Sequence, residues 1–288
     1  MMRLVLCLLA LIATSPAFAQ TDVNAKAREL LAARHLDGAF IMQDVRKGTA
    51  IADASTGEKW QDGVQPLSTT KLFLAALAWE HGIKTSVDLR ELIAQGSDAD
   101  GRMLALELRH GAGSEAILAN LARFGFPTCA AQQTLNCFAL SPKTSDADWA
   151  STLAVGETNI RVTLARLSDF LGIVGRNGTD MHSRILNEAT AHMLQVAMRQ
   201  TVTDGTAKGI REHLPPGFMI GGKTGTGPAD AHPYDGIFAG LVFDAHARPR
   251  YTVAVYVRGD GPGGGAAAEI AADLAAFVVT SRSASDGL

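Results

Sequence analysis

Segments with the pattern of β-strands lie near both ends of this 288-residue chain, whereas segments with helical periodicity fill its middle. The strand-like segments are residues 38–45, 49–54, 220–226, 234–244 and 250–258. Helical patterns cover residues 22–35, 66–121, 162–199 and 266–280. The sequence therefore predicts an α+β fold, in which an antiparallel sheet is built from both chain ends and flanked by helices. The middle of the chain is expected to form an all-helical subdomain.

The start of the chain has the three parts of a secretory signal peptide. Arg3 supplies a basic residue, residues 4–13 are apolar, and residues 16–19 end in a small-x-small cleavage pattern. The apolar run is shorter than the roughly 20 residues that cross a bilayer, and an uncleaved anchor is the alternative. We predict that residues 1–19 are a signal peptide, that the protein is exported to the periplasm, and that the mature chain has no membrane span.

Residues 20–288 are expected to form a single domain with a sheet part, residues 20–65 and 200–288, and a helical part, residues 66–199. The formal net charge of −3 argues against a nucleic-acid partner, and no basic run interleaved with aromatic residues offsets it. A lysine in a near-neutral protein can still form a local site for a small anion. Such a site suits a small anionic ligand better than a polyanion. We also expect the protein to be a monomer.

Two cysteines, Cys129 and Cys137, lie outside the predicted signal peptide. In an oxidising compartment, a close and even pair of cysteines favours a disulfide, which would contribute roughly 2 to 3 kcal/mol by closing a short loop. Two buried free thiols are the alternative. A metal site is disfavoured, because no second Cys or His pair stands at ligand spacing.

A hydroxyl and an amine lie three positions apart at Ser68 and Lys71. Apolar residues recur at helical spacing over residues 66–82, so the two side chains are expected one turn apart on one helix face. A lysine that reaches a serine can activate it as a nucleophile, and the start of a helix favours a developing oxyanion. Taken alone, this spacing also fits a solvated helix start.

A second polar motif, Lys223-Thr224-Gly225-Thr226, opens a predicted strand. Its cation and two hydroxyls can bind a carboxylate, and the glycine lets a substrate backbone approach closely. A Gly-rich hairpin is the alternative. A phosphate-binding loop would lead its lysine into a helix, whereas Lys223 leads into a strand.

With Ser68-x-x-Lys71 followed by Lys223-Thr224-Gly225, the sequence resembles the penicillin-binding transpeptidases and serine β-lactamases from about residue 45 to residue 257. The second motif of these proteins, Ser-x-Asn, corresponds to Ser97-Asp98-Ala99, in which alanine takes the asparagine position. A shifted alignment keeps Asp98 for the asparagine but displaces the serine. Capping of the helix that starts near residue 100 is the structural alternative for both residues.

The resemblance implies a reaction. Ser68 would attack an acyl carbon, Lys71 would take its proton as the base, and Ser97 would return a proton to the departing nitrogen. Lys223, Thr224, Gly225 and Thr226, with Asp98, would bind the substrate, and the backbone N–H groups of Ser68 and Thr226 would form the oxyanion hole. No metal or organic cofactor is expected.

The resemblance leaves three functions open. We favour a D-Ala-D-Ala transpeptidase or carboxypeptidase that acts on peptidoglycan stem peptides and is acylated by β-lactams at Ser68. A serine β-lactamase is the first alternative; its deacylation base would be Glu157, the only nearby candidate by order, or a carbamylated Lys71. A sensor or scaffold that keeps the fold without turnover is the second alternative, because the second motif is altered.

Overall fold

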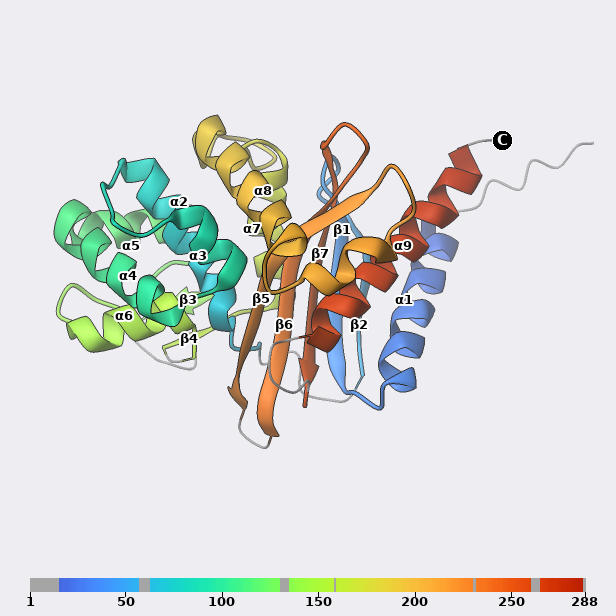
Figure 1. The fold of residues 1–288 in the computed structure, drawn as a ribbon, viewed down its shortest axis with the longest axis horizontal. Helices are drawn as coiled ribbons and strands as arrows, with labels where there is room; N and C mark the ends of the chain where they lie inside the picture. The colour runs from blue at the N-terminus through green and yellow to red at the C-terminus, as the bar shows by residue number, and fades with distance from the viewer. Residues whose placement is uncertain are drawn as a thin grey trace, which may run out of the picture.

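The structure is a computed structural model, and it describes residues 16–56, 63–129, 135–157, 159–229, 232–259 and 265–286. Five antiparallel strands form one sheet in the order β2-β1-β7-β6-β5. They are β1 (Gly38–Asp44), β2 (Ala50–Ser55), β5 (Met219–Ala229), β6 (His232–Phe243) and β7 (Pro249–Arg258). Gly38 pairs with Val257 across β1 and β7, which confirms that both chain ends share one sheet (Figure 1).

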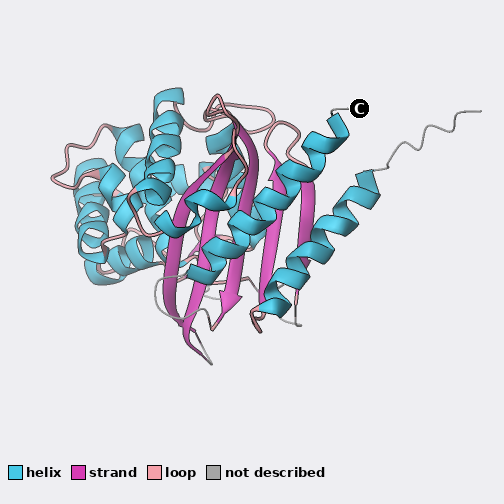
Figure 2. Cartoon of the chain, turned by 45° about the vertical axis from the view of Figure 1, so that its right-hand side comes forward, coloured by secondary structure: helices cyan, strands magenta, loops and turns pink. Residues whose placement is uncertain are grey.

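Helices cover both faces of the sheet. The terminal helices α1 (Pro16–Ala33) and α9 (Gly265–Asp286) run across one face (Figure 2). The helices α7 (Leu164–Gly175) and α8 (Glu188–Thr203) pack on the other face, between the sheet and the helical part of the chain. Each face carries its own apolar core. Among the described helices, none combines the length and the hydropathy that a bilayer-spanning segment requires.

The helical part surrounds one central helix, α2 (Lys71–His81), whose residues from Lys71 to Ala78 are all buried. A helix that is apolar on every side must be covered on every side. Its neighbours are α8 and the helices α3 (Leu89–Gln95), α4 (Asp98–Ala112), α5 (Ser114–Arg123) and α6 (Asp146–Val155). The same part of the chain contains the paired two-residue strands β3 (Cys137–Phe138) and β4 (Ile160–Arg161). The 3-10 segments η2 (Leu67–Thr70) and η3 (Lys208–His213) join this part to the sheet.

The helical pattern over residues 66–121 divides into several helices in the structure. The chain takes left-handed φ values at Gly82 and Gly96, which end α2 and α3. The Asp88 side chain accepts the N–H groups of Arg90 and Glu91 and so starts α3. Helix α1 begins at Pro16 instead of residue 22, because proline is well suited to a first helical position. Residues 1–15, with most of the predicted signal peptide, lie outside the described residues.

The predicted disulfide is present between Cys129 and Cys137. It lies beside an aromatic cluster in which the Phe73 ring of α2 contacts Phe126 at 4.7 Å and Phe138 at 6.3 Å between ring centroids. The bridge therefore fastens β3 to the core around α2, next to the helix that follows Ser68.

Candidate active site

Ser68 lies in η2, a short turn between the edge strand β5 and the helical part. The hydroxyls of Thr69 and Thr70 donate to backbone carbonyl oxygens three residues earlier. Such local bonds favour a tight turn over a regular helix. As a result α2 begins at Lys71, and Ser68 precedes the helix instead of lying within it. The predicted one-turn separation of the two side chains is kept.

The backbone before Ser68 is held in an unusual conformation. Leu67 has a φ of 49°, a left-handed value that costs a branched residue about 1 to 3 kcal/mol. Two glycines allow it: a Cβ atom on Gly156 would lie 2.3 Å from the Leu67 carbonyl oxygen, and one on Gly225 would lie 3.0 Å from the Ser68 nitrogen. This close approach brings the Ser68 amide directly against β5, and it explains why the residue between Thr224 and Thr226 lacks a side chain.

Lys71 bridges the serine to a carboxylate. Its Nζ donates to the Ser68 Oγ at 2.8 Å and to the Asp98 Oδ1 at 2.6 Å. The Lys71 side chain is fully buried, whereas that of Asp98 is 55% exposed. Burial lowers the pKa of Lys71, and the hydrogen bond and charge of Asp98 oppose that change in part. The Lys71 amine therefore loses its proton more easily than that of an ordinary lysine, and it is hydrogen-bonded to the Ser68 hydroxyl.

In the second motif, the neighbouring residues Ser97 and Asp98 make different contacts. The Ser97 Oγ accepts the N–H of Asp100 and caps α4, which was the structural alternative for this residue. Asp98, at the first position of α4, is the residue that contacts Lys71. No interaction in the structure tests the predicted proton transfer by Ser97, which stays a prediction, as does substrate binding by Asp98.

Lys223 and Thr224 are consecutive residues of β5. The Lys223 side chain is buried, and its Nζ donates to the Thr224 carbonyl oxygen at 2.7 Å. A Cβ atom on Gly96 would lie 2.9 Å from this Nζ, so the amine reaches the turn just before Ser97 and Asp98. The Thr224 hydroxyl forms a 2.7 Å hydrogen bond with that of Thr206. Burial, followed by repulsion from Lys71, lowers the pKa of Lys223 to about 7.

A pKa of about 7 makes the affinity for carboxylates depend on pH. Lys223 loses its charge as the pH rises through that value, so we expect the acylation rate for a carboxylate-bearing β-lactam to fall relative to its uncharged ester. The ratio of the two rates, measured from about pH 6 to about pH 9, removes the effect of Lys71 and should fall up to about tenfold per unit above the pKa. In Lys223→Arg the ratio should stay level. If the ratio does not change with pH in the unmodified protein, Lys223 is not the group that binds the carboxylate.

Glu157 approaches the same place from the end of α6. A Cβ atom on Gly227 would lie 3.1 Å from the Glu157 Oε1, and Gly227 follows Thr226 on β5. Burial, followed by the charge of Asp98, raises the pKa of Glu157. The structure therefore brings five predicted side chains, those of Ser68, Lys71, Asp98, Glu157 and Lys223, into one region, although they come from η2, α2, α4, the loop after α6, and β5. A role for Glu157 as a base stays a prediction.

The sequence reasoning did not identify the direct Lys71–Asp98 pair or the glycines at positions 96 and 156. Gly96 and Gly156 have left-handed φ values and follow helices, a pattern readable as a C-cap. Nothing in the sequence shows that these caps press against the amine of Lys223 and the backbone of Leu67.

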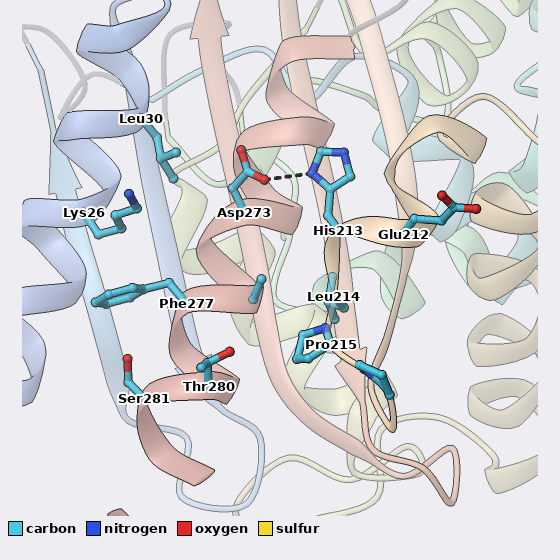
Figure 3. A pocket seen from close by; sticks show the side chains of 12 residues that line it. Lys26, Leu30, Glu212, His213, Leu214, Pro215, Asp273, Phe277, Thr280 and Ser281 are labelled. Carbon is cyan, nitrogen blue, oxygen red and sulfur yellow. Dashed lines mark hydrogen bonds and ion pairs between the residues drawn. The ribbon is translucent and has the colours of Figure 1, made fainter. Parts of the chain in front are cut away.

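A pocket of about 880 Å3 lies on the opposite face of the sheet from Ser68, between α1, η3 and α9 (Figure 3). Two of its polar side chains contact each other, since the Asp273 carboxylate lies 2.7 Å from the His213 Nδ1. The same carboxylate accepts a 3.0 Å hydrogen bond from the guanidinium of Arg34, a residue next to the pocket. Arg34 directly follows α1, whereas His213 belongs to η3 and Asp273 to α9. The network therefore ties three elements together and stabilises this face.

A five-stranded antiparallel sheet, a buried central helix with a serine one turn before its lysine, and a second lysine on the edge strand define the class. The motifs predicted this combination of features, which is typical of the penicillin-binding transpeptidases and serine β-lactamases. In its fold and in these motifs the chain is similar to this superfamily.

Comparisons with known proteins support that assignment. Residues 143–276 match the family described as penicillin binding protein transpeptidase domain. The transpeptidase domain of the FtsI4 D,D-transpeptidase from Legionella pneumophila is similar to this chain with 25% identity and a TM-score of 0.73, over 91% of this chain and 96% of that one. A peptidoglycan glycosyltransferase from Burkholderia ambifaria gives 17% identity and the same TM-score, 0.73, over 93% and 96%. A search among curated proteins gave no significant match.

Proposed function

We propose that this protein is an exported serine acyl-enzyme of the D,D-transpeptidase or carboxypeptidase type, acting on peptidoglycan stem peptides. The observation that carries the proposal is the contact of the buried Lys71 amine with the Ser68 hydroxyl at 2.8 Å, beside Lys223 on the edge strand. The family match and the Legionella D,D-transpeptidase domain, at 25% identity, support the same reaction class.

In the proposed reaction the Ser68 Oγ attacks the carbonyl carbon of the penultimate D-alanine. Lys71 takes the hydroxyl proton, and the N–H groups of Ser68 and Thr226 stabilise the oxyanion. The C–N bond then breaks, the departing amine receives a proton, and the terminal D-alanine leaves. An amine acceptor attacks the resulting ester to form a new peptide bond, or water attacks it to give the free acid.

The position of Asp98 supports a route for the proton. Its carboxylate is hydrogen-bonded to the buried Lys71 amine and is itself half exposed, so it connects that amine with the solvent side of the site. Proton return to the leaving nitrogen would pass through Lys71 and Asp98, or through Ser97 if its hydroxyl leaves the helix cap. Lys223, Thr224 and Thr226 would bind the terminal carboxylate of the substrate.

A β-lactamase is the second candidate, and the position of Glu157 beside Gly227 is the observation that favours it. Such a carboxylate could orient the water that hydrolyses an acyl-enzyme. The same proximity would also suit a base that takes the proton of an incoming amine.

Time-resolved mass spectrometry with benzylpenicillin separates these functions. We expect one covalent adduct on Ser68 that persists or clears slowly, together with release of D-alanine from a peptide ending in D-Ala-D-Ala. A rapidly lost adduct with fast nitrocefin hydrolysis would identify a β-lactamase instead. If no adduct forms and no D-alanine is released, the protein is a sensor or scaffold and the proposal is wrong.

A further inference from the structure

A polar pocket of about 500 Å3 opens where β6 turns into β7. We call it the arginine pocket; its charged and amide residues are Arg46, Asn177, His192, Gln195, Asp244, Arg248 and Arg250. Lys223 of β5 pairs with Ala239 of β6. Asp244 lies five residues beyond Ala239 along the chain, which is about 16 Å at the rise of a strand. The arginine pocket is therefore separate from the site around Ser68.

One buried carboxylate organises this pocket. The Asp244 Oδ2 accepts both the Nε and a terminal nitrogen of Arg248 at 2.9 Å, and a terminal nitrogen of Arg250 lies 3.6 Å away. The Oδ1 accepts the backbone N–H groups of His246 and Arg248. Burial raises the pKa of Asp244, but these hydrogen bonds outweigh it and bring the pKa to about 2. Asp244 therefore stays charged and holds two guanidinium groups at the pocket.

The lining has more positive than negative charge. Three arginines face a single carboxylate, so the formal excess is two positive charges with His192 neutral. Arg248 and Arg250 keep 68% and 43% of their side-chain surface exposed. Arg46 comes from the β1–β2 turn, and within the described part of the chain no ion pair joins it to a carboxylate. This excess is local, since the whole chain has a net charge of −3.

A neutral donor completes the lining. The buried Gln195 side chain donates to the carbonyl oxygen of Val174 at 2.8 Å and to the Asn177 Oδ1 at 3.1 Å. Because the oxygen of the Asn177 amide is used in this way, its NH2 group is the part that can serve a ligand.

We propose that the arginine pocket binds a small oxyanion with two negative charges, either a phosphate ester or two carboxylates on one molecule. Guanidinium groups bind such oxygens through paired N–H donors, and here two of them are positioned in advance by Asp244. The volume of about 500 Å3 is within the range of small-molecule sites. The charge excess of the lining matches the charge of this ligand.

Titration calorimetry on the full chain at about pH 8 and constant ionic strength tests the proposal with glycerol 3-phosphate and succinate as probes, because each carries two negative charges at this pH. We expect saturable binding of one anion per chain. Arg250→Gln and Arg46→Gln should each weaken it, and the double variant should weaken it at least tenfold, as expected for lost charge-assisted hydrogen bonds. These variants keep the Arg248–Asp244 pair that the fold needs. Arg28→Gln, at an exposed position on α1, removes the same charge elsewhere and should leave the affinity unchanged.

The two probes distinguish the sources of the anion. Tighter binding of glycerol 3-phosphate supports a phosphate ester, and tighter binding of succinate supports a ligand with two carboxylates. Ser68→Ala should bind either probe as the unmodified protein does, so failure of the proposed catalysis would not affect this result. The proposal is overturned if neither probe gives saturable heat, or if the double variant, shown to be folded by thermal denaturation, binds with unchanged affinity.

Discussion

Replacing Ser68 by alanine is expected to abolish covalent labelling by fluorescent penicillin and to lower D-alanine release by roughly 10^4-fold or more. The change removes the atom that forms the ester, and Lys71 offers no second nucleophile because its amine is buried and bound to Asp98. Thermal denaturation should show a folded protein, since the buried apolar groups around Ser68 are untouched. In-gel fluorescence and intact-mass measurements report the two outcomes.

Ser86→Ala is the matched control, because Ser86 is an exposed serine in the turn between α2 and α3. It should be labelled as the unmodified protein is. Ser97→Ala adds a test of the predicted proton donor: a fall as deep as that of Ser68→Ala would show that the Ser97 hydroxyl does more than cap α4. Normal labelling of Ser68→Ala would contradict the assignment of the nucleophile.

Replacing Asp98 by asparagine should lower the maximal acylation rate by roughly 10^2-fold and move its rising limb to lower pH. The rate falls because the bond that fixes the Lys71 amine on Ser68 is weakened. The shift has a definite sign: Asp98 raises the pKa of Lys71, so its loss lowers that pKa, and a larger fraction of Lys71 is uncharged at any given pH. Stopped-flow acylation by a chromogenic β-lactam across pH measures both effects.

Asp100→Asn is the control for Asp98→Asn. It removes an equal charge from the first turn of the same helix, and it keeps the backbone N–H that bonds to Ser97. We expect its pH profile to stay near that of the unmodified protein. If the rising limb of the acylation rate moves to higher pH in Asp98→Asn, Asp98 does not act through Lys71. The same conclusion holds if Asp100→Asn shifts that limb as Asp98→Asn does.

Much of the sheet could be predicted from the sequence. The near-continuous apolar runs of β1, β6 and β7 face apolar cores on both sides of the sheet, so their pattern follows burial directly. The sequence also predicts a strand at Lys223 and Thr224, and the structure confirms β5 there. The disulfide followed from the spacing of two cysteines in a chain predicted to be exported.

The details of the site could not be predicted, because they depend on contacts between distant segments. The sequence pattern does not distinguish Ser97 from Asp98 as the partner of Lys71, since one residue of rotation at the start of α4 exchanges them. The left-handed Leu67 is also hidden in the sequence, because the glycines that permit it are at positions 156 and 225. The local hydrogen bonds of Thr69 and Thr70 favour a tight turn there, but the contacts that permit the left-handed Leu67 come from distant segments.

The pairing of β1 with β7 has a consequence for how the chain matures. Gly38 must find Val257, and β5, which supports Ser68, joins the sheet only through β6 and β7. Contacts so distant in sequence form late, after most of the polypeptide has been synthesised. A partly synthesised chain therefore contains Ser68 and Lys71 but lacks β5, which packs against them in the complete sheet. We expect Ser68 to become reactive only after β7 has paired with β1 and β6.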